Sequence, residues 1–265
     1  MIAALQMYDW DEVQGRTDAF WAKAVENLVA ERRDPPRALS RPRDMSAPWR
    51  DPSLYLAQTC GLPFVSGRCA DANILARADY GVEGARDGRY ASVLICRADA
   101  DGETLTDFRG QVVAINDYGS QSGCNALADT VLDAWDDRAP LFGKSVQSGS
   151  HRASATMVAD GKADVAAIDP VSWSLFTELD PDRHARLRVF AHSRETPSLP
   201  FITASDDPDL QTDLWHALSH AAENAAAAPG IPRHILPAKA DDYVPIRMMA
   251  QRVKGLRLAP NAPVL

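Results

Sequence analysis

The sequence predicts an α/β protein of two lobes, with mixed sheets flanked by helices. Apolar runs of strand length alternate with stretches of helical periodicity along most of the chain. Such β-α-β alternation is typical of a mostly parallel sheet whose crossover connections are helices. The last third of the chain is mainly helical, so its helices must pack on sheets that are built from earlier residues.

Each element follows from its local pattern. Apolar runs bounded by turn residues predict strands, and apolar residues that recur every three or four positions predict helices. The predicted strands are Ile2–Met7, Ser53–Thr59, Tyr90–Arg97, Gln111–Asn116, Ser145–Ser148, Asp164–Ile168 and Arg186–Ala191. The predicted helical segments are Thr17–Arg33, Thr104–Gly110, Cys124–Trp135, Arg152–Asp160, Ser172–Glu178, Leu210–Ala228 and Asp242–Lys254.

The order of these elements predicts a discontinuous first lobe. We expect the chain to cross between lobes near residues 92–98 and 188–200. The first lobe then comprises residues 1–93 and 195–265, and the second comprises residues 94–194. No strong strand is predicted after Ile202, and the C-terminal helices are expected to return to the first lobe. Because α/β folds bind ligands beyond the carboxyl ends of strands, a cleft between the lobes is the expected site.

Composition excludes several classes of function. The 265 residues include 28 Lys and Arg against 36 Asp and Glu, which gives a formal charge of −8 and no basic face for nucleic acid. The longest apolar runs are far shorter than the roughly 18 to 20 residues that span a bilayer. The first residues lack the pattern of a secretory signal, so we expect either a cytoplasmic protein or one whose signal has been removed.

The four cysteines predict neither a metal site nor a redox motif. Cys60, Cys69, Cys96 and Cys124 show no C-x-x-C spacing and no accompanying histidine pattern. In a chain of this length such cysteines are typically reduced and buried. A pairing of Cys60 with Cys69 across a loop is the alternative, and no cofactor is expected.

The segment at residues 112–123 is the most informative. A buried strand ends there in a polar turn that opens a helix, and Ser120 and Ser122 place hydroxyl donors beside the unpaired N–H groups of its first turn. This geometry suits an oxyanion, although either serine could simply cap the helix. The turn has Gln121 where a nucleophile elbow needs serine, and no lysine follows Gly123 as a P-loop requires.

Two further strand ends carry polar residues. Ser150 and His151 lie between a predicted strand and a predicted helix, so they are expected at the same sheet edge as the serine turn. Asp169 follows the next strand and precedes a helix. It is predicted to cap that helix, with a ligand contact as the alternative.

These residues carry a resemblance to a known family. The runs NDYGSQSG at 116–123, SGSHRAS at 148–154 and MVADGKADVAAIDPVSW at 157–173 resemble the substrate-binding components of phosphate, phosphite and phosphonate ABC importers. The segments RYASVLI at 89–95 and LTDFRG at 105–110 extend the likeness over about residues 88–175. The resemblance implies a type II periplasmic-binding-protein fold with a two-strand hinge that closes on an oxyanion, and a membrane permease as partner.

The resemblance also assigns site residues. Ser120, Gln121, Ser122, His151 and Tyr90 are expected on the oxyanion. The loops after the first two strands, with Tyr8, Trp10 and Thr59, lie where the family's remaining contacts fall, and Asp169 is the candidate partner for an amine.

The resemblance leaves an enzyme as the alternative function. The same fold is similar to cytoplasmic enzymes of menaquinone and thiamine-precursor biosynthesis. Such an enzyme needs a general base in the cleft, for which His151 and Asp9 are the candidates. The expected function remains transport, with a periplasmic location and no catalytic residue.

Overall fold

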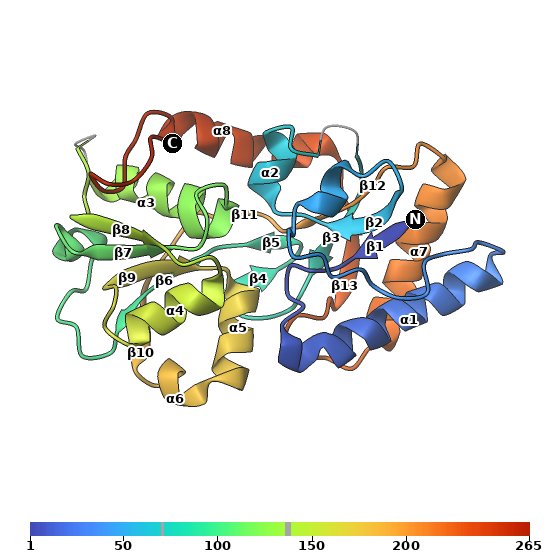
Figure 1. Cartoon of the computed structure of the whole chain (residues 1–265), viewed down its shortest axis with the longest axis horizontal. Coiled ribbons are helices and arrows are strands. Elements are labelled where there is room, and N and C mark those ends of the chain that lie inside the picture. Colours follow the sequence, from blue (N-terminus) through green and yellow to red (C-terminus); the bar gives the residue numbers. More distant parts are fainter. Residues whose placement is uncertain (70–71, 136–138) are drawn as a thin grey trace. The chain divides into compact units, whose positions relative to one another are not determined.

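The computed structural model describes residues 1–69, 72–135 and 139–265, which form two compact units. The first unit comprises Met1–Arg89 and Pro197–Val244, and the second comprises Tyr90–Thr196 and Pro245–Leu265. The crossings at residues 89–90 and 196–197 lie in strands β5 (Arg89–Tyr90) and β11 (Thr196–Pro197), which pair in a small sheet with β4 (Ala85–Arg86) (Figure 1).

The first unit contains a mixed sheet in the order β1-β2-β12-β3-β13. Strands β1 and β2 are parallel, and β12 runs antiparallel to both β2 and β3. The bounds of the strands are Ile2–Ala4 (β1), Leu54–Gln58 (β2), Asn73–Asp79 (β3), Pro200–Thr203 (β12) and His234–Pro237 (β13).

Helices α1 (Gln14–Ala30) and α7 (Pro208–Asn224) pack against each other in this unit (Figure 1). Helix α1 buries the apolar stripe that the sequence predicts, including Phe20, Trp21 and Leu28. The short helices α2 (Gly61–Val65), η1 (Asp11–Val13) and η2 (Ala47–Arg50) fill the connections, and η5 (Ala240–Tyr243) precedes the last crossing.

The second unit contains a sheet in the order β10-β6-β9-β7-β8. Strand β7 runs parallel to its two neighbours β8 and β9, whereas β6 runs antiparallel to β9 and β10. The bounds of the strands are Val93–Arg97 (β6), Val112–Ile115 (β7), Lys144–Gln147 (β8), Val165–Ile168 (β9) and Leu187–His192 (β10).

The connections of this sheet are helical. They are η3 (Leu105–Phe108), η4 (Gln121–Asn125), α3 (Ala126–Ala134), α4 (His151–Ala159), α5 (Pro170–Leu179) and α6 (Pro181–His184). Helix α8 (Val244–Val253) connects no two strands of this sheet and follows η5 in the chain. Helix η4 is π-helical and continues directly into α3. Helices α3, α4 and α5 each bury apolar residues, as the β-α-β pattern predicts.

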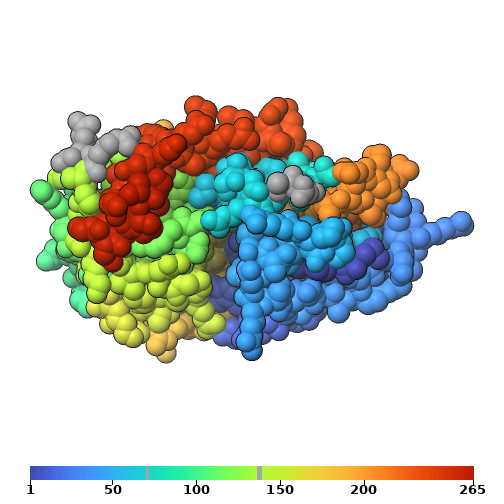
Figure 2. All heavy atoms as spheres, turned by 45° about the horizontal axis from the view of Figure 1, so that its top comes forward, coloured from blue at the N-terminus to red at the C-terminus, as the bar shows by residue number. Residues whose placement is uncertain are grey.

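The structure corrects two expectations about the C-terminal third. Residues 245–265 belong to the second unit rather than the first, because Val253, Leu256 and Leu258 are buried in its core with residues of β7 and α3. Figure 2 shows this segment, in dark red, lying against the green atoms of that unit. A strand also follows Ile202 after the turn at Gly230, since β13 pairs with the edge of β3.

Candidate functional site

Three neighbouring parallel strands of the second unit end at one sheet edge, and each leads into a helix. Strands β7, β8 and β9 are followed by the helices that begin at Gln121, His151 and Pro170. The first N–H groups of a helix lack intrahelical acceptors and carry the positive end of its dipole. The N–H groups that open the helices at Gln121 and His151 can therefore hold an anion without a charged side chain, whereas those at Pro170 already donate to the Asp169 carboxylate.

The turn after β7 is held by its own polar groups. Ser120 is the N-cap of the π-helical segment, and its Oγ accepts a hydrogen bond of 3.1 Å from the Gly123 N–H. The Asn116 side chain, directly after the strand, donates from Nδ2 to the same Ser120 Oγ at 3.2 Å. The N-cap role that the sequence left open for Ser120 is thus present.

Close packing explains the glycine in this turn. A Cβ atom at Gly123 would lie 1.9 Å from Asn116 Oδ1 and 3.1 Å from His151 Cε1. Only a residue without a side chain lets the Asn116 amide and the His151 ring approach the helix backbone this closely.

The structure brings Ser122 and His151 into direct contact. Ser122 Oγ lies 2.7 Å from His151 Nε2, and Asn116 Nδ2 lies 3.4 Å from the same ring nitrogen. Ser120 Oγ lies 3.5 Å from Ser122 Oγ. Asn116, Ser120, Ser122 and His151 therefore form one group of hydrogen-bonding side chains, which we term the serine–histidine cluster.

His151 is neutral at physiological pH. Burial lowers the pKa of its imidazole from 6.5 to about 4, because removal from water disfavours the charged ring. The side chains of the cluster thus offer hydroxyl, amide and imidazole groups without a permanent charge. Such neutral donors, with the helix N-termini, suit an anion that carries its own charge.

The remaining predicted residues of the second unit have different surroundings. The Gln121 side chain is fully buried: its Nε2 donates to Met249 Sδ at 3.1 Å, and its Oε1 accepts from Asn125 Nδ2 at 2.6 Å. The Asp169 Oδ1 accepts hydrogen bonds from the Val171 and Ser172 N–H groups, which is the helix-capping arrangement. Tyr90 is buried beside the first crossing, at the start of the unit.

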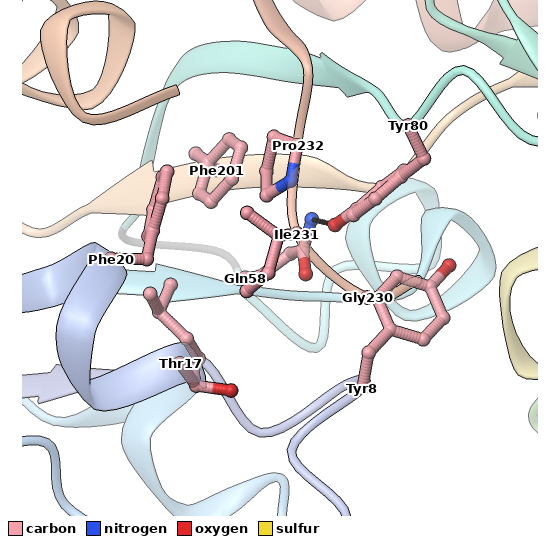
Figure 3. Close-up of a pocket in the computed structure, with 10 residues that line it drawn as sticks. Tyr8, Thr17, Phe20, Gln58, Tyr80, Phe201, Gly230, Ile231 and Pro232 are labelled. Atoms are coloured by element: carbon pink, nitrogen blue, oxygen red, sulfur yellow. Dashed lines mark hydrogen bonds between the residues drawn. The ribbon is translucent and has the colours of Figure 1, made fainter. Parts of the chain in front are cut away.

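Tyr8, Trp10 and Thr59 lie in the first unit. Tyr8 packs edge to face on Tyr80 and lines a small pocket with aromatic walls, in which Gln58 Nε2 donates to the Tyr80 hydroxyl at 2.7 Å (Figure 3). The Thr59 hydroxyl is fully buried and lies 3.6 Å from Cys69 Sγ. The structure places Trp10 at the N-cap of η1, where it is half-buried.

Asp9, a candidate base for an enzyme, forms a salt bridge. Arg41 Nε lies 2.6 Å from its carboxylate, whose side chain is 4% exposed, and Arg41 also contacts Asp18. Both oxygens of this carboxylate accept hydrogen bonds from Arg41. This arrangement gives Asp9 a structural partner in the first unit.

Sequence reasoning gave no role to Asn116 or Ser92. The position of Asn116, first after the apolar run 112–115, is the signal that could have found it. Ser92 left no such signal, since its hydroxyl donates to the Ser122 carbonyl at 3.0 Å across the fold.

The four cysteines are buried and carry free thiols. The alternative Cys60–Cys69 disulfide is therefore absent. Within the described ranges, no group of His, Cys, Asp or Glu residues is arranged to hold a metal ion. In the same part of the chain no helix has the length and hydropathy needed to cross a bilayer.

Two α/β units joined by crossing strands, one with serines and helix N-termini at a sheet edge, define the class of two-lobed solute-binding proteins. The chain is similar to PhnD1 from Prochlorococcus marinus in complex with methylphosphonate, with a TM-score of 0.74, 16% identity, and 95% of this chain and 96% of that one covered. The chloride-bound XAC2383 protein from Xanthomonas citri gives a TM-score of 0.68 at 17% identity, covering 92% of this chain and 95% of that one.

The periplasmic aliphatic sulphonate binding protein SsuA from Escherichia coli is also similar, with a TM-score of 0.58, 15% identity and coverage of 94% and 91%. A search of curated protein sequences returned no match. The family model for the phosphonate ABC transporter periplasmic substrate-binding protein matches residues 13–243. The chain belongs to this family of periplasmic transport components.

Proposed function

We propose that the chain binds a small tetrahedral oxyanion of the phosphonate, phosphite, phosphate or phosphate-ester type and delivers it to an ABC permease. The Ser122–His151 contact of 2.7 Å, at the sheet edge where two helices begin, is the observation that carries this proposal. Ser120 and Ser122 donate hydrogen bonds from their hydroxyls to two oxygens of the anion, and the neutral His151 ring donates its Nε2–H to a third oxygen.

The chemistry of the cluster favours binding without turnover. Its side chains lie at a sheet edge where neutral donors can surround an oxyanion. Asp9, the other candidate base, already accepts hydrogen bonds from Arg41 on both of its carboxylate oxygens. We therefore expect the protein to release its ligand chemically unchanged, as a transport component must.

The remaining predicted contacts stay part of the proposal. Tyr90 is proposed as a further donor to the anion, and Tyr8, Trp10 and Thr59 as contacts for the rest of the ligand. Gln121 is proposed to act through its backbone, because its side chain is already bonded to Met249 and Asn125.

Calorimetric titration with methylphosphonate, phosphite, phosphate and methanesulfonate tests the proposal. The Ser122→Ala variant loses one hydrogen bond to a charged group, which contributes about 1.5 to 3 kcal/mol, so its affinity should fall about ten-fold or more. Thr177→Ala is the control, since it removes a hydroxyl of the same unit that donates only to the Trp173 carbonyl of its own helix. Absence of binding by every anion would refute the proposal.

A further inference from the structure

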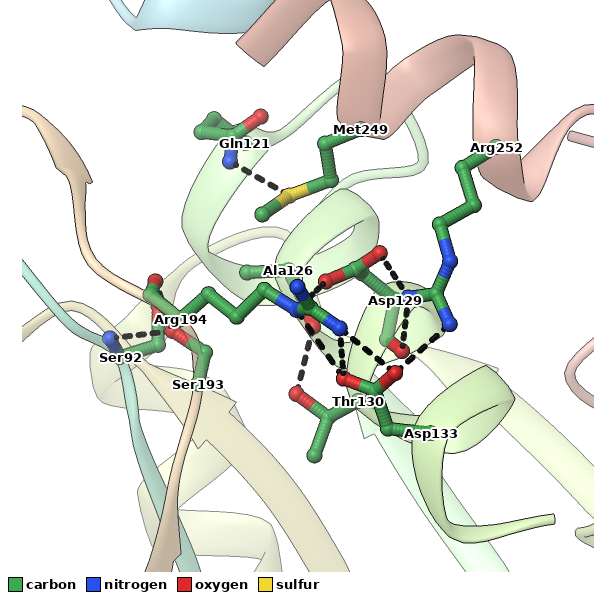
Figure 4. Close-up of polar contacts among 10 residues, drawn as sticks. All are labelled: Ser92, Gln121, Ala126, Asp129, Thr130, Asp133, Ser193, Arg194, Met249 and Arg252. Atoms are coloured by element: carbon green, nitrogen blue, oxygen red, sulfur yellow. Dashed lines mark hydrogen bonds and ion pairs between the residues drawn. The ribbon is translucent and has the colours of Figure 1, made fainter. Parts of the chain in front are cut away.

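A network of ion pairs joins helix α3 to two segments that lie near chain crossings (Figure 4). Asp129 and Asp133 stand one helical turn apart on α3 and both contact Arg194 and Arg252. The Arg252 guanidinium donates to Asp129 Oδ1, and Arg194 Nε lies 3.1 Å from Asp129 Oδ2. Asp133 Oδ1 lies 2.6 Å from Arg252 and 2.7 Å from Arg194.

Asp129 is the buried member of this network. Its side chain is 3% exposed, whereas those of Arg194 and Arg252 are 60% and 38% exposed. A buried carboxylate is tolerated because both guanidinium groups compensate its charge. Loss of that charge would therefore weaken the attachment of both arginines to α3 at once and leave Asp133 as their remaining partner on this helix.

The partners of Asp129 lie where the chain enters or leaves the second unit. Arg194 is two residues from the crossing at 196–197, and Arg252 lies on α8, which follows the crossing at 244–245. The segment after the crossing at 89–90 reaches the same helix, because the Ser92 hydroxyl donates to the Ser122 carbonyl. Ser92 and Ser193 also exchange hydrogen bonds of 2.9 Å.

The same helix carries the serine turn at its N-terminus. Residues Gln121–Asn125 continue without a break into α3, and Gln121 contacts Met249 one turn before Arg252 on α8. The serine turn and the ion pairs thus lie on one continuous helical segment, and both are attached to the crossings.

We propose that Asp129 is a positioning residue of the oxyanion site, which fixes the serine turn relative to the segments that connect the two units. The inference rests on the function proposed above. Asp129 acts through α3 and through its two arginines, and it does not touch the ligand. Binding at Ser122 and rearrangement of the crossings are coupled through this helix.

The test compares Asp129→Asn with Asp160→Asn. Asp160 likewise pairs with two arginines of the second unit, Arg183 and Arg186, at 3.2 Å each, but contacts neither the serine turn nor a crossing. Methylphosphonate affinity is measured by calorimetry, and hydrogen exchange of residues 120–126 is measured in the free protein. Arg194→Gln is the second variant if Asp129→Asn does not fold, because Arg194 is exposed.

Asp129→Asn should weaken binding about five-fold and accelerate exchange in the serine turn, while Asp160→Asn changes neither. Arg194→Gln should give a smaller effect that Arg194→Lys partly restores. Unchanged affinity for Asp129→Asn, with or without faster exchange, would overturn the inference, as would an equal loss for Asp160→Asn. If the wild type bound no anion, the proposed function would fail first and the inference with it.

Discussion

His151 shows how burial sets the chemistry of a single residue. Its pKa of about 4 in the free protein lies below the usual 6.5, so the unfolded chain binds a proton between these values and the folded chain does not. The contribution of this residue to stability therefore falls as pH decreases from 6.5 to 4. An imidazole that is neutral at pH 7 attracts an anion less than the imidazolium would.

A bound anion should raise the pKa of His151, because a nearby negative charge favours the protonated ring. Binding at about pH 5.5 should then take up part of a proton, and affinity should rise as pH falls. Titrations in buffers of different ionisation enthalpy measure this uptake. His151→Gln, titrated with the same ligand, subtracts the ligand's own protonation. Equal uptake by both proteins would show that the histidine is not linked to binding.

Two substitutions of Asp169 can distinguish a structural role from a ligand contact. Because it caps α5 through Val171 and Ser172, Asp169→Ala should lower the free energy of unfolding by about 1 kcal/mol in denaturant titrations. Asp169→Asn keeps a capping oxygen and should be close to wild type in stability. A large loss of affinity for an aminoalkylphosphonate in the stable Asn variant would contradict a purely capping role.

At the scale of elements, sequence patterns predicted those strands and helices whose formation depends mainly on neighbouring residues. The apolar run Val112–Ile115 is a strand as expected, and α1 buries its predicted stripe. Strands β3 and β13 were not predicted, because they pair with each other across a long stretch of sequence. Strand β13 has only four residues, ends in a proline and lies at the edge of the sheet, so its own sequence gives a weak strand signal. Likewise, helical periodicity cannot show which unit α8 joins, since Leu256 and Leu258 beyond its end make the decisive contacts.

The candidate site was likewise predictable where it depends on local sequence and not where it depends on distant residues. Strand order and turn composition placed Ser120, Ser122 and His151 at one edge, and the structure brings them together. The direction of the Gln121 side chain was not predictable, because its partner Met249 is 128 residues away in sequence. The network around Asp129 also depends on such distant partners.

At the scale of the whole molecule, the chain passes between its two units in short segments. If the ligand contacts residues of both, it stabilises the closed form by its differential affinity, as a hinged binding protein requires. Small-angle scattering should then give a smaller radius of gyration with saturating methylphosphonate than without it. The ligand recovered afterwards should be unaltered. Binding without compaction would count against the hinge, and an altered ligand would favour an enzyme.

The most direct test of the central claim is a crystal structure of the protein with methylphosphonate. The account predicts tetrahedral density at the sheet edge after β7 and β8, with its oxygens within hydrogen-bonding distance of Ser120 Oγ, Ser122 Oγ and His151 Nε2. Density for the ligand at any other place, with Ser122 and His151 still bonded to each other, would contradict it.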